Sequence, residues 1–176
     1  MESSKFLIDD YINKNSDLDI KELRSSLYNE GVLTKDYENE LLLLLYNRFE
    51  NKNKNDLEKE CRSVILDRKT MSIVSYSCNT PITNMEALNY MLKESTNINK
   101  FYECYEGTLM SLFYFNDKWF LSTRRCLDSK KSKWKERTYY DMFCDVLNLD
   151  NLDLDTFTDK LDKNHCYYFI LVHFNN

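Results

Sequence analysis

The stretch FYECYEGTLMSLFYF, residues 101–115, is the part of the sequence that most constrains the fold. From residue 109 onward, apolar side chains occupy both sets of alternating positions, which is typical of a β-strand buried on both faces. The chain holds two glycines, and one of them, Gly107, lies inside this stretch. A glycine within a strand marks a bulge or a close approach to the backbone. We therefore expect a buried central strand with a special feature near its beginning.

Four further runs have the β-rich composition of strands. They are CRSVIL (61–66), MSIVSYS (71–77), KWFLSTRR (118–125) and CYYFILVHF (166–174). The letters DRKT between the first two runs, and NDK at the start of the third, predict hairpin turns. The strands should therefore pair mostly in the antiparallel direction.

Short helices are predicted between these strands. Residues 37–50 form the strongest candidate, with leucines of the run 41–45 on one face. Residues 80–95 predict a second helix that begins with a capping box of Thr83 and Glu86. Two more helices are expected at 138–148 and 153–162. Because no regular βαβ rhythm is present, the fold class is α+β, with mostly antiparallel sheets and short flanking helices.

The chain of 176 residues has the length of one compact unit. Its first sixty residues are polar and favour helix, and NKNKND (51–56) reads as a solvated loop. We therefore expect a helical N-terminal segment at 1–56, followed by an α+β domain at 57–176.

Composition excludes several classes of protein. A net charge of −5 argues against a surface that is coated by nucleic acid, but it leaves room for a local basic site. Six dispersed cysteines without a C-x-x-C pair, and only two histidines, predict no metal site. No window approaches the ~20 apolar residues of a membrane span, so no membrane association is expected. The first residues do not resemble a secretory signal, which predicts reduced thiols and a protein that is not secreted.

Four short motifs carry a resemblance to a known family. CYEGTL (104–109) resembles the K-x-D-G motif, often followed by Ser/Thr-Leu, of RNA-ligase-type nucleotidyltransferases, a superfamily that includes ATP-dependent ligases and capping guanylyltransferases. CRSVILD (61–67), STRRCLDS (122–129) and YYFILVH (167–173) resemble strands that flank this motif. The resemblance spans about residues 60–176 and implies a nucleotidyltransferase-like fold similar to the first part of a ligase adenylation domain.

The sequence departs from the family in ways that matter chemically. The family's lysine nucleophile is replaced by Cys104, and the nearest lysine, Lys100, lies ~13 Å away along an extended strand. Ile170 stands where the family's last strand carries a glutamate, and the later phosphate-binding lysines would follow Asn176. We therefore expect a degenerate, truncated and catalytically inactive domain with no catalytic residue, because phosphoryl transfer depends on positioning and on charge neutralisation.

Binding residues can still be assigned by this resemblance and by charge. The resemblance implies nucleotide-binding roles for four residues, namely Arg62, Glu106, Gly107 and Arg124. Residues 118–137 hold eight basic side chains, two acidic ones and two tryptophans. Cations interleaved with aromatic rings suit single-stranded nucleic acid, although a solvated basic loop would have the same composition. The predicted nucleic-acid-binding residues are Arg125, Lys130, Lys131, Lys133, Trp134 and Lys135.

Three functions follow from these observations. The first is an inactive ligase-like domain that serves as a binding or structural part of a viral assembly, since the AT-rich bias of the composition resembles that of large DNA viruses. Its partners would be other protein subunits and RNA, in the virion or the host cytoplasm. The second is the N-terminal part of an active RNA ligase or guanylyltransferase, which would use ATP or GTP with Mg²⁺; otherwise no cofactor is expected. The third is a structural interaction domain that docks through leucines 41–45.

Overall fold

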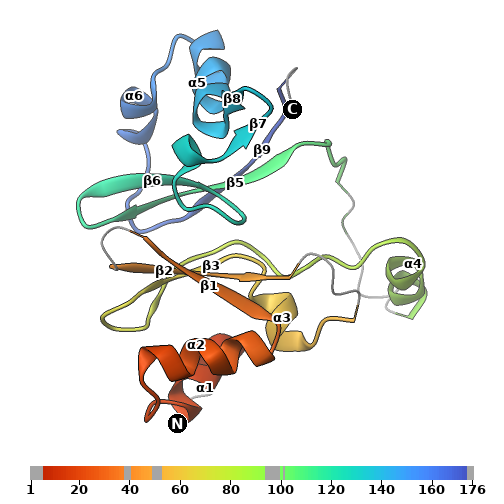
Figure 1. Cartoon of the computed structure of the whole chain (residues 1–176). Coiled ribbons are helices and arrows are strands. Elements are labelled where there is room, and N and C mark those ends of the chain that lie inside the picture. The colour runs from red at the N-terminus through yellow and green to blue at the C-terminus, as the bar shows by residue number, and fades with distance from the viewer. Residues whose placement is uncertain (1–5, 38–40, 49–52, 94–99, 101, 174–176) are drawn as a thin grey trace.

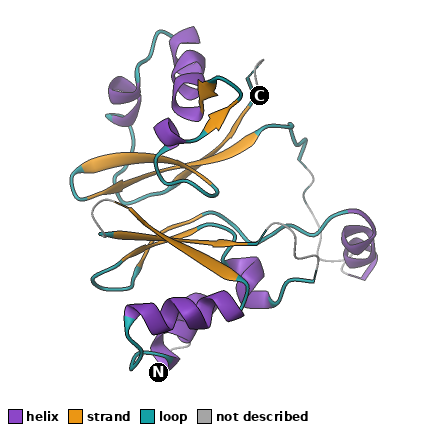
Figure 2. Cartoon of the chain, viewed as in Figure 1, coloured by secondary structure: helices purple, strands orange, loops and turns teal. Residues whose placement is uncertain are grey.

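The computed structural model describes residues 6–37, 41–48, 53–93, 100 and 102–173. Two antiparallel sheets stack face to face, and helices cover the outer face of each sheet (Figure 1). Figure 2 shows this order of layers as helix, strand, strand and helix. The α+β class with antiparallel sheets is therefore confirmed.

The first sheet contains four strands in the order β1-β2-β3-β4. Their bounds are Val32–Tyr37, Leu42–Asn47, Val64–Asp67 and Ile73–Tyr76. The helices α1 (Leu7–Lys14) and α2 (Ile20–Asn29) pack on its outer face, and α3 (Asp56–Glu60) lies beside it. The buried carboxylate of Glu60 accepts the backbone N–H groups of Leu7 and Ile8, which ties α3 to the start of α1.

The second sheet contains three strands in the order β6-β5-β9. Their bounds are Lys118–Thr123, Thr108–Phe115 and Tyr167–Leu171. The helices α5 (Tyr139–Leu149) and α6 (Leu154–Thr158) cover this sheet. A 3-10 turn η1 (Ser129–Lys131) and a small hairpin of β7 (Lys133–Trp134) and β8 (Arg137–Thr138) connect β6 to α5.

Three apolar clusters fill the spaces between the layers, and β5 contributes to two of them. Met110 and Leu112 face α5, whereas Phe113 faces the first sheet. This alternation confirms the prediction that the central strand is buried on both faces. The predicted hairpins are also present, because β3 pairs with β4 and β5 pairs with β6 in the antiparallel direction.

The helix predicted at residues 37–50 is wrong. Residues 42–47 form β2, whose leucines alternate between two cores. Leu43 and Leu45 pack toward the helices α1 and α2, and Leu42 and Leu44 pack toward the second sheet. A strand buried on both faces has a continuous apolar sequence, so periodicity cannot distinguish it from a buried helix.

Two further expectations are corrected by β1 and β2. The segment 1–56 is helical only in its first part, because residues 32–37 and 42–47 are strands. The first sheet also continues across residue 56, since β2 pairs with β3. The leucines proposed as a docking surface are inside the protein, because Leu42, Leu43, Leu44 and Leu45 have no exposed surface.

The helix α4 (Asn84–Lys93), which was predicted from the sequence, stands apart from the two sheets (Figure 1). None of its residues is buried. Met85 is 65% exposed and Leu92 is 70% exposed.

Candidate functional site

Arg62 and Arg124, two of the residues predicted to bind nucleotide, lie at one end of the stacked sheets. Arg62 comes just before β3, and Arg124 comes just after β6. The Arg124 guanidinium donates a hydrogen bond to the side-chain oxygen of Asn47, at the end of β2, and another to the Asn47 backbone carbonyl at 3.3 Å. Arg124 therefore links the two sheets at this end.

Asn47 is fully buried and organises this end of the protein. Its side-chain nitrogen donates to the backbone carbonyl of Glu58 at 2.9 Å and to the hydroxyl of Thr80 at 2.7 Å. One amide thus joins β2, α3, the segment before α4 and Arg124. Asn47 lies in the stretch that was predicted to be a helix, so its role could not be foreseen. A polar residue that ends an apolar run was the signal that could have identified it.

Arg62, Arg124 and Arg125 form what we call the arginine cluster. Partial burial lowers the pKa of Arg124 from its ordinary value, and the nearby positive charges of Arg125 and Arg62 lower it further. Arg62 also donates to the sulfur of Cys78 at 3.1 Å, and the Arg125 guanidinium lies 5.6 Å from the centre of the Tyr46 ring. Like charges held together in a partly desolvated place favour a bound anion.

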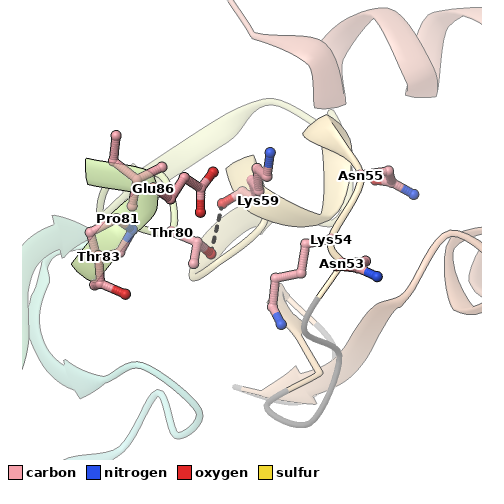
Figure 3. Close-up of a pocket in the computed structure, with 9 residues that line it drawn as sticks. Asn53, Lys54, Asn55, Lys59, Thr80, Pro81, Thr83 and Glu86 are labelled. Carbon is pink, nitrogen blue, oxygen red and sulfur yellow. Dashed lines mark hydrogen bonds between the residues drawn. The ribbon is translucent and has the colours of Figure 1, made fainter. Parts of the chain in front are cut away.

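A pocket of about 610 Å³ lies between the segment 53–59 and the segment 80–86 (Figure 3). Its wall includes Thr80, which is hydrogen-bonded to Asn47 and through it connected to Arg124. Lys54 and Lys59 bring positive charge to the lining and Glu86 brings negative charge. The remaining lining residues are Asn53, Asn55, Pro81, Ile82 and Thr83. The pocket is therefore polar, and sequence reasoning did not find it, because it forms between segments that are distant in the chain.

The segment that carries Cys104 and Glu106 is an exposed loop before β5. Within the described part of the chain, its hydrogen bonds are internal. The Cys104 sulfur lies 3.8 Å from the Tyr105 carbonyl, and the Tyr105 hydroxyl donates to the Glu103 carboxylate at 3.2 Å. Arg62 and Arg124 thus lie in one cluster. Among the described residues, Glu106 forms no hydrogen bond or ion pair with either of them.

Gly107 is explained by the packing of its own sheet. A Cβ atom at this position would lie 2.4 Å from the backbone oxygen of Leu171 and 2.9 Å from a methyl group of Ile170. Both residues belong to β9, which pairs with β5. Of the two reasons considered for a glycine here, close approach to the backbone is the one that applies.

The six residues predicted to contact nucleic acid lie in two places. Arg125 belongs to the arginine cluster, whereas the other five lie between residues 130 and 135. The side chains of Lys130, Lys131, Lys133, Trp134 and Lys135 are all exposed. Trp134 is 45% exposed and Lys135 has a positive φ of 53° in the turn between β7 and β8.

Two features are absent from the residues that the structure describes. No helix among them is long and apolar enough to cross a membrane. Likewise, no group of three or more His, Cys, Asp or Glu side chains among them is arranged to hold a metal ion.

Comparison with known proteins finds one distant relative. The chain is similar to the "Putative bifunctional polynucleotide kinase/RNA ligase" of Autographa californica nuclear polyhedrosis virus, with 29% identity over 128 residues. The alignment covers 68% of this chain and 18% of that protein, so the chain spans less than a fifth of its relative. No family model matches the sequence, and no solved structure matches it. The chain is thus distantly similar to part of a viral protein whose name joins a polynucleotide kinase and an RNA ligase.

Proposed function

We propose that this chain is an RNA-ligase-related domain that binds nucleotide phosphates at the arginine cluster without forming a covalent nucleotide adduct. The observation that carries the proposal is the gathering of Arg62, Arg124 and Arg125 at one end of the sheets, where their positive charges act on one another and attract an anion. The distant relative named as an RNA ligase supports the same class of ligand.

The residues present fit a nucleoside triphosphate. Guanidinium groups bind phosphate oxygens through two parallel hydrogen bonds, and Arg62 and Arg125 would supply them. Arg124 is held by its hydrogen bond to Asn47, and its positive charge would add to the attraction for the phosphates. The neighbouring polar pocket, lined by Lys54 and Thr80, has room for the rest of the nucleotide.

The surroundings of Cys104 favour binding without group transfer. A cysteine becomes a nucleophile as a thiolate, which requires a nearby base or cation. Among the described residues, the contact of the Cys104 sulfur is with the Tyr105 carbonyl, which is neither a strong base nor a cation. The sulfur is also in an exposed loop, where no packing would hold it in line with a phosphorus atom.

Titration calorimetry with ATP and GTP tests the binding half of the proposal. The double variant Arg62→Ala/Arg125→Ala is expected to weaken binding at least tenfold, because each bidentate phosphate contact is charge-assisted. Arg68→Ala is the matched control, since Arg68 pairs with Asp36 and its backbone N–H bonds to Leu41 at the opposite end of β2. Equal losses in both variants, or no binding by the unmodified protein, would overturn this half.

Incubation with α-labelled ATP or GTP and Mg²⁺ or Mn²⁺, followed by a denaturing gel, tests the other half. We expect no labelled protein band. A band that is lost in Cys104→Ala would show that the thiol attacks the α-phosphorus and expels pyrophosphate. It would favour the reading of the chain as part of an active enzyme.

We further propose that the domain works within a viral assembly, in the virion or the host cytoplasm. The helix α4 supports protein partners, because its apolar side chains are exposed rather than packed on the sheets. Replacing Met85, Leu88 and Leu92 by serine should abolish co-purification of such partners while leaving the unfolding transition in place. Retention of the same partners by this variant would count against the role of α4.

A further inference from the structure

Beyond the arginine cluster, the connection between β6 and α5 forms a second basic feature, which we call the basic arm (residues 128–138). It contains η1 and the β7–β8 hairpin. The arm has five basic and two acidic residues in a chain whose net charge is −5. Positive charge is therefore concentrated here against an acidic background.

The arm is held in place rather than loosely solvated. Arg137 forms an ion pair with Asp145 of α5 at 2.6 Å, and Thr138 caps α5 by accepting the N–H of Asp141 at 3.0 Å. The backbone N–H of Tyr139 bonds to the carbonyl of Ser132 at 3.0 Å and closes the base of the hairpin. Side chains on such a framework lose less entropy when they bind a ligand.

On the exposed surface of the arm, an aromatic side chain lies between two positively charged ones. Trp134 lies between Lys133 and Lys135 in the chain, and neither lysine forms an ion pair among the residues that the structure describes. Lys135 occupies a left-handed turn position, where glycine or asparagine is sterically cheaper. At the base of the arm, Lys131 pairs with Asp128 at 3.5 Å and the Lys130 ammonium lies 4.3 Å from the centre of the Tyr140 ring.

We propose that the basic arm binds single-stranded nucleic acid, with a base stacked on Trp134 and the backbone phosphates contacted by Lys133 and Lys135. A tryptophan that is 45% exposed beside lysines offers a stacking surface that an unpaired base can reach, whereas a base inside a duplex cannot. The site is separate from the arginine cluster and does not depend on the nucleotide proposal.

Fluorescence anisotropy with labelled 12-nucleotide oligo(U) and oligo(dT), and with a 12-base-pair RNA duplex, tests this site. The unmodified protein should bind both single strands more tightly than the duplex. Trp134→Ala should weaken binding about tenfold, since a stacked base contributes ~1–3 kcal/mol. Trp134→Phe should keep most of the affinity of the unmodified protein, because phenylalanine also offers a ring for stacking. Binding should also quench tryptophan fluorescence in the unmodified protein and not in Trp134→Phe.

The double variant Lys133→Ala/Lys135→Asn tests the phosphate contacts. It should reduce the dependence of log Kd on log salt by about 1.4, since each phosphate contact on a single strand contributes ~0.7. Asparagine tolerates the left-handed backbone at position 135, so the variant should fold at least as well as the parent. Lys21→Ala/Lys69→Ala, which alters two exposed lysines elsewhere, should bind as the parent does.

Four outcomes would overturn the proposal. The first is that the unmodified protein binds neither single strand at low salt, and the second is that it binds the duplex as tightly as the single strands. The third is that the control pair Lys21→Ala/Lys69→Ala loses as much affinity as the arm variants. The fourth is that the arm variants keep nucleic-acid binding but lose binding to an acidic polypeptide. The last result would assign the arm to a protein partner. In each case ATP binding at the arginine cluster should be unchanged, so the two proposals fail separately.

Discussion

Residues 41–48 and residues 102–107 make an instructive pair. The first segment has no recognisable motif, yet it contributes fully buried leucines to two cores and holds Arg124 through Asn47. The second carries the motif-like letters CYEG, yet Cys104 and Glu106 are exposed and Tyr105 is 63% exposed. Within this second segment, the residue that its surroundings constrain is Gly107, directly before β5.

The difference shows which of the residues assigned to a site are held by the sheets and which are not. Arg124 stands just after β6 and is hydrogen-bonded to Asn47 at the end of β2, so it cannot move without disturbing both sheets. Cys104 stands on an exposed loop whose hydrogen bonds, among the described residues, are internal. Under the function proposed above, a fixed Arg124 and an unanchored thiol suit binding rather than in-line displacement. Four substitutions test this contrast, in order of decreasing effect on stability.

The largest effect is expected for Leu44→Ala. Leu44 is fully buried between the sheets, so its truncation should lower the free energy of unfolding by about 3 kcal/mol through lost burial and a residual cavity. Urea denaturation measures the change. Leu41→Ala is the control, because Leu41 is 49% exposed and should cost less than about 1 kcal/mol. Equal costs at both positions would contradict the strand assignment.

Asn47→Ala should lower the free energy of unfolding by about 2–3 kcal/mol. The substitution leaves the buried carbonyl of Glu58 without its amide donor and removes the side-chain oxygen that Arg124 contacts. The same denaturation experiment measures the loss, and Asn89→Ala on the exposed face of α4 serves as the control. A change below about 0.5 kcal/mol would show that Asn47 does not organise this end of the sheets.

Gly107→Ala should cost about 1–2 kcal/mol. The added methyl would clash with the backbone of Leu171, and β5 or β9 would have to shift. Glu106→Ala next to it should leave stability unchanged, because that side chain is exposed. If Gly107→Ala is as stable as the parent but binds nucleotide poorly, the glycine serves a ligand rather than the packing of the sheet.

Cys104→Ala should change the free energy of unfolding by less than about 0.5 kcal/mol. Its thiol is exposed and contacts only a neighbouring carbonyl among the described residues. Alkylation supplies a second measurement. Cys104 should react in the native protein, whereas buried Cys61, whose pKa is raised by burial and by the negative charge of Glu60, should react only after unfolding. Slow native alkylation of Cys104 would indicate a covered thiol.

Much of the architecture could be predicted from local patterns. Turn residues predicted the β3–β4 and β5–β6 hairpins, and the apolar pattern of residues 109–115 predicted a strand buried on both faces. Of the residues assigned to the site from the sequence, Arg62 and Arg124 lie near one another, and their nucleotide-binding roles stay predictions. Asn47 and the pocket beside Thr80 were not predictable, since their roles depend on contacts between residues far apart in the chain.

The amino-acid sequence by itself determined the α+β class, the hairpins and the charge of the arm, because these follow from residue types and short-range spacing. Only the tertiary structure decided that the leucine run 42–45 is a strand, since burial on both faces removes the periodicity that would identify it. The tertiary structure likewise placed Arg62 beside Arg124 and left Cys104 on an exposed loop. Pairing of distant strands sets such proximities, and no local pattern encodes them.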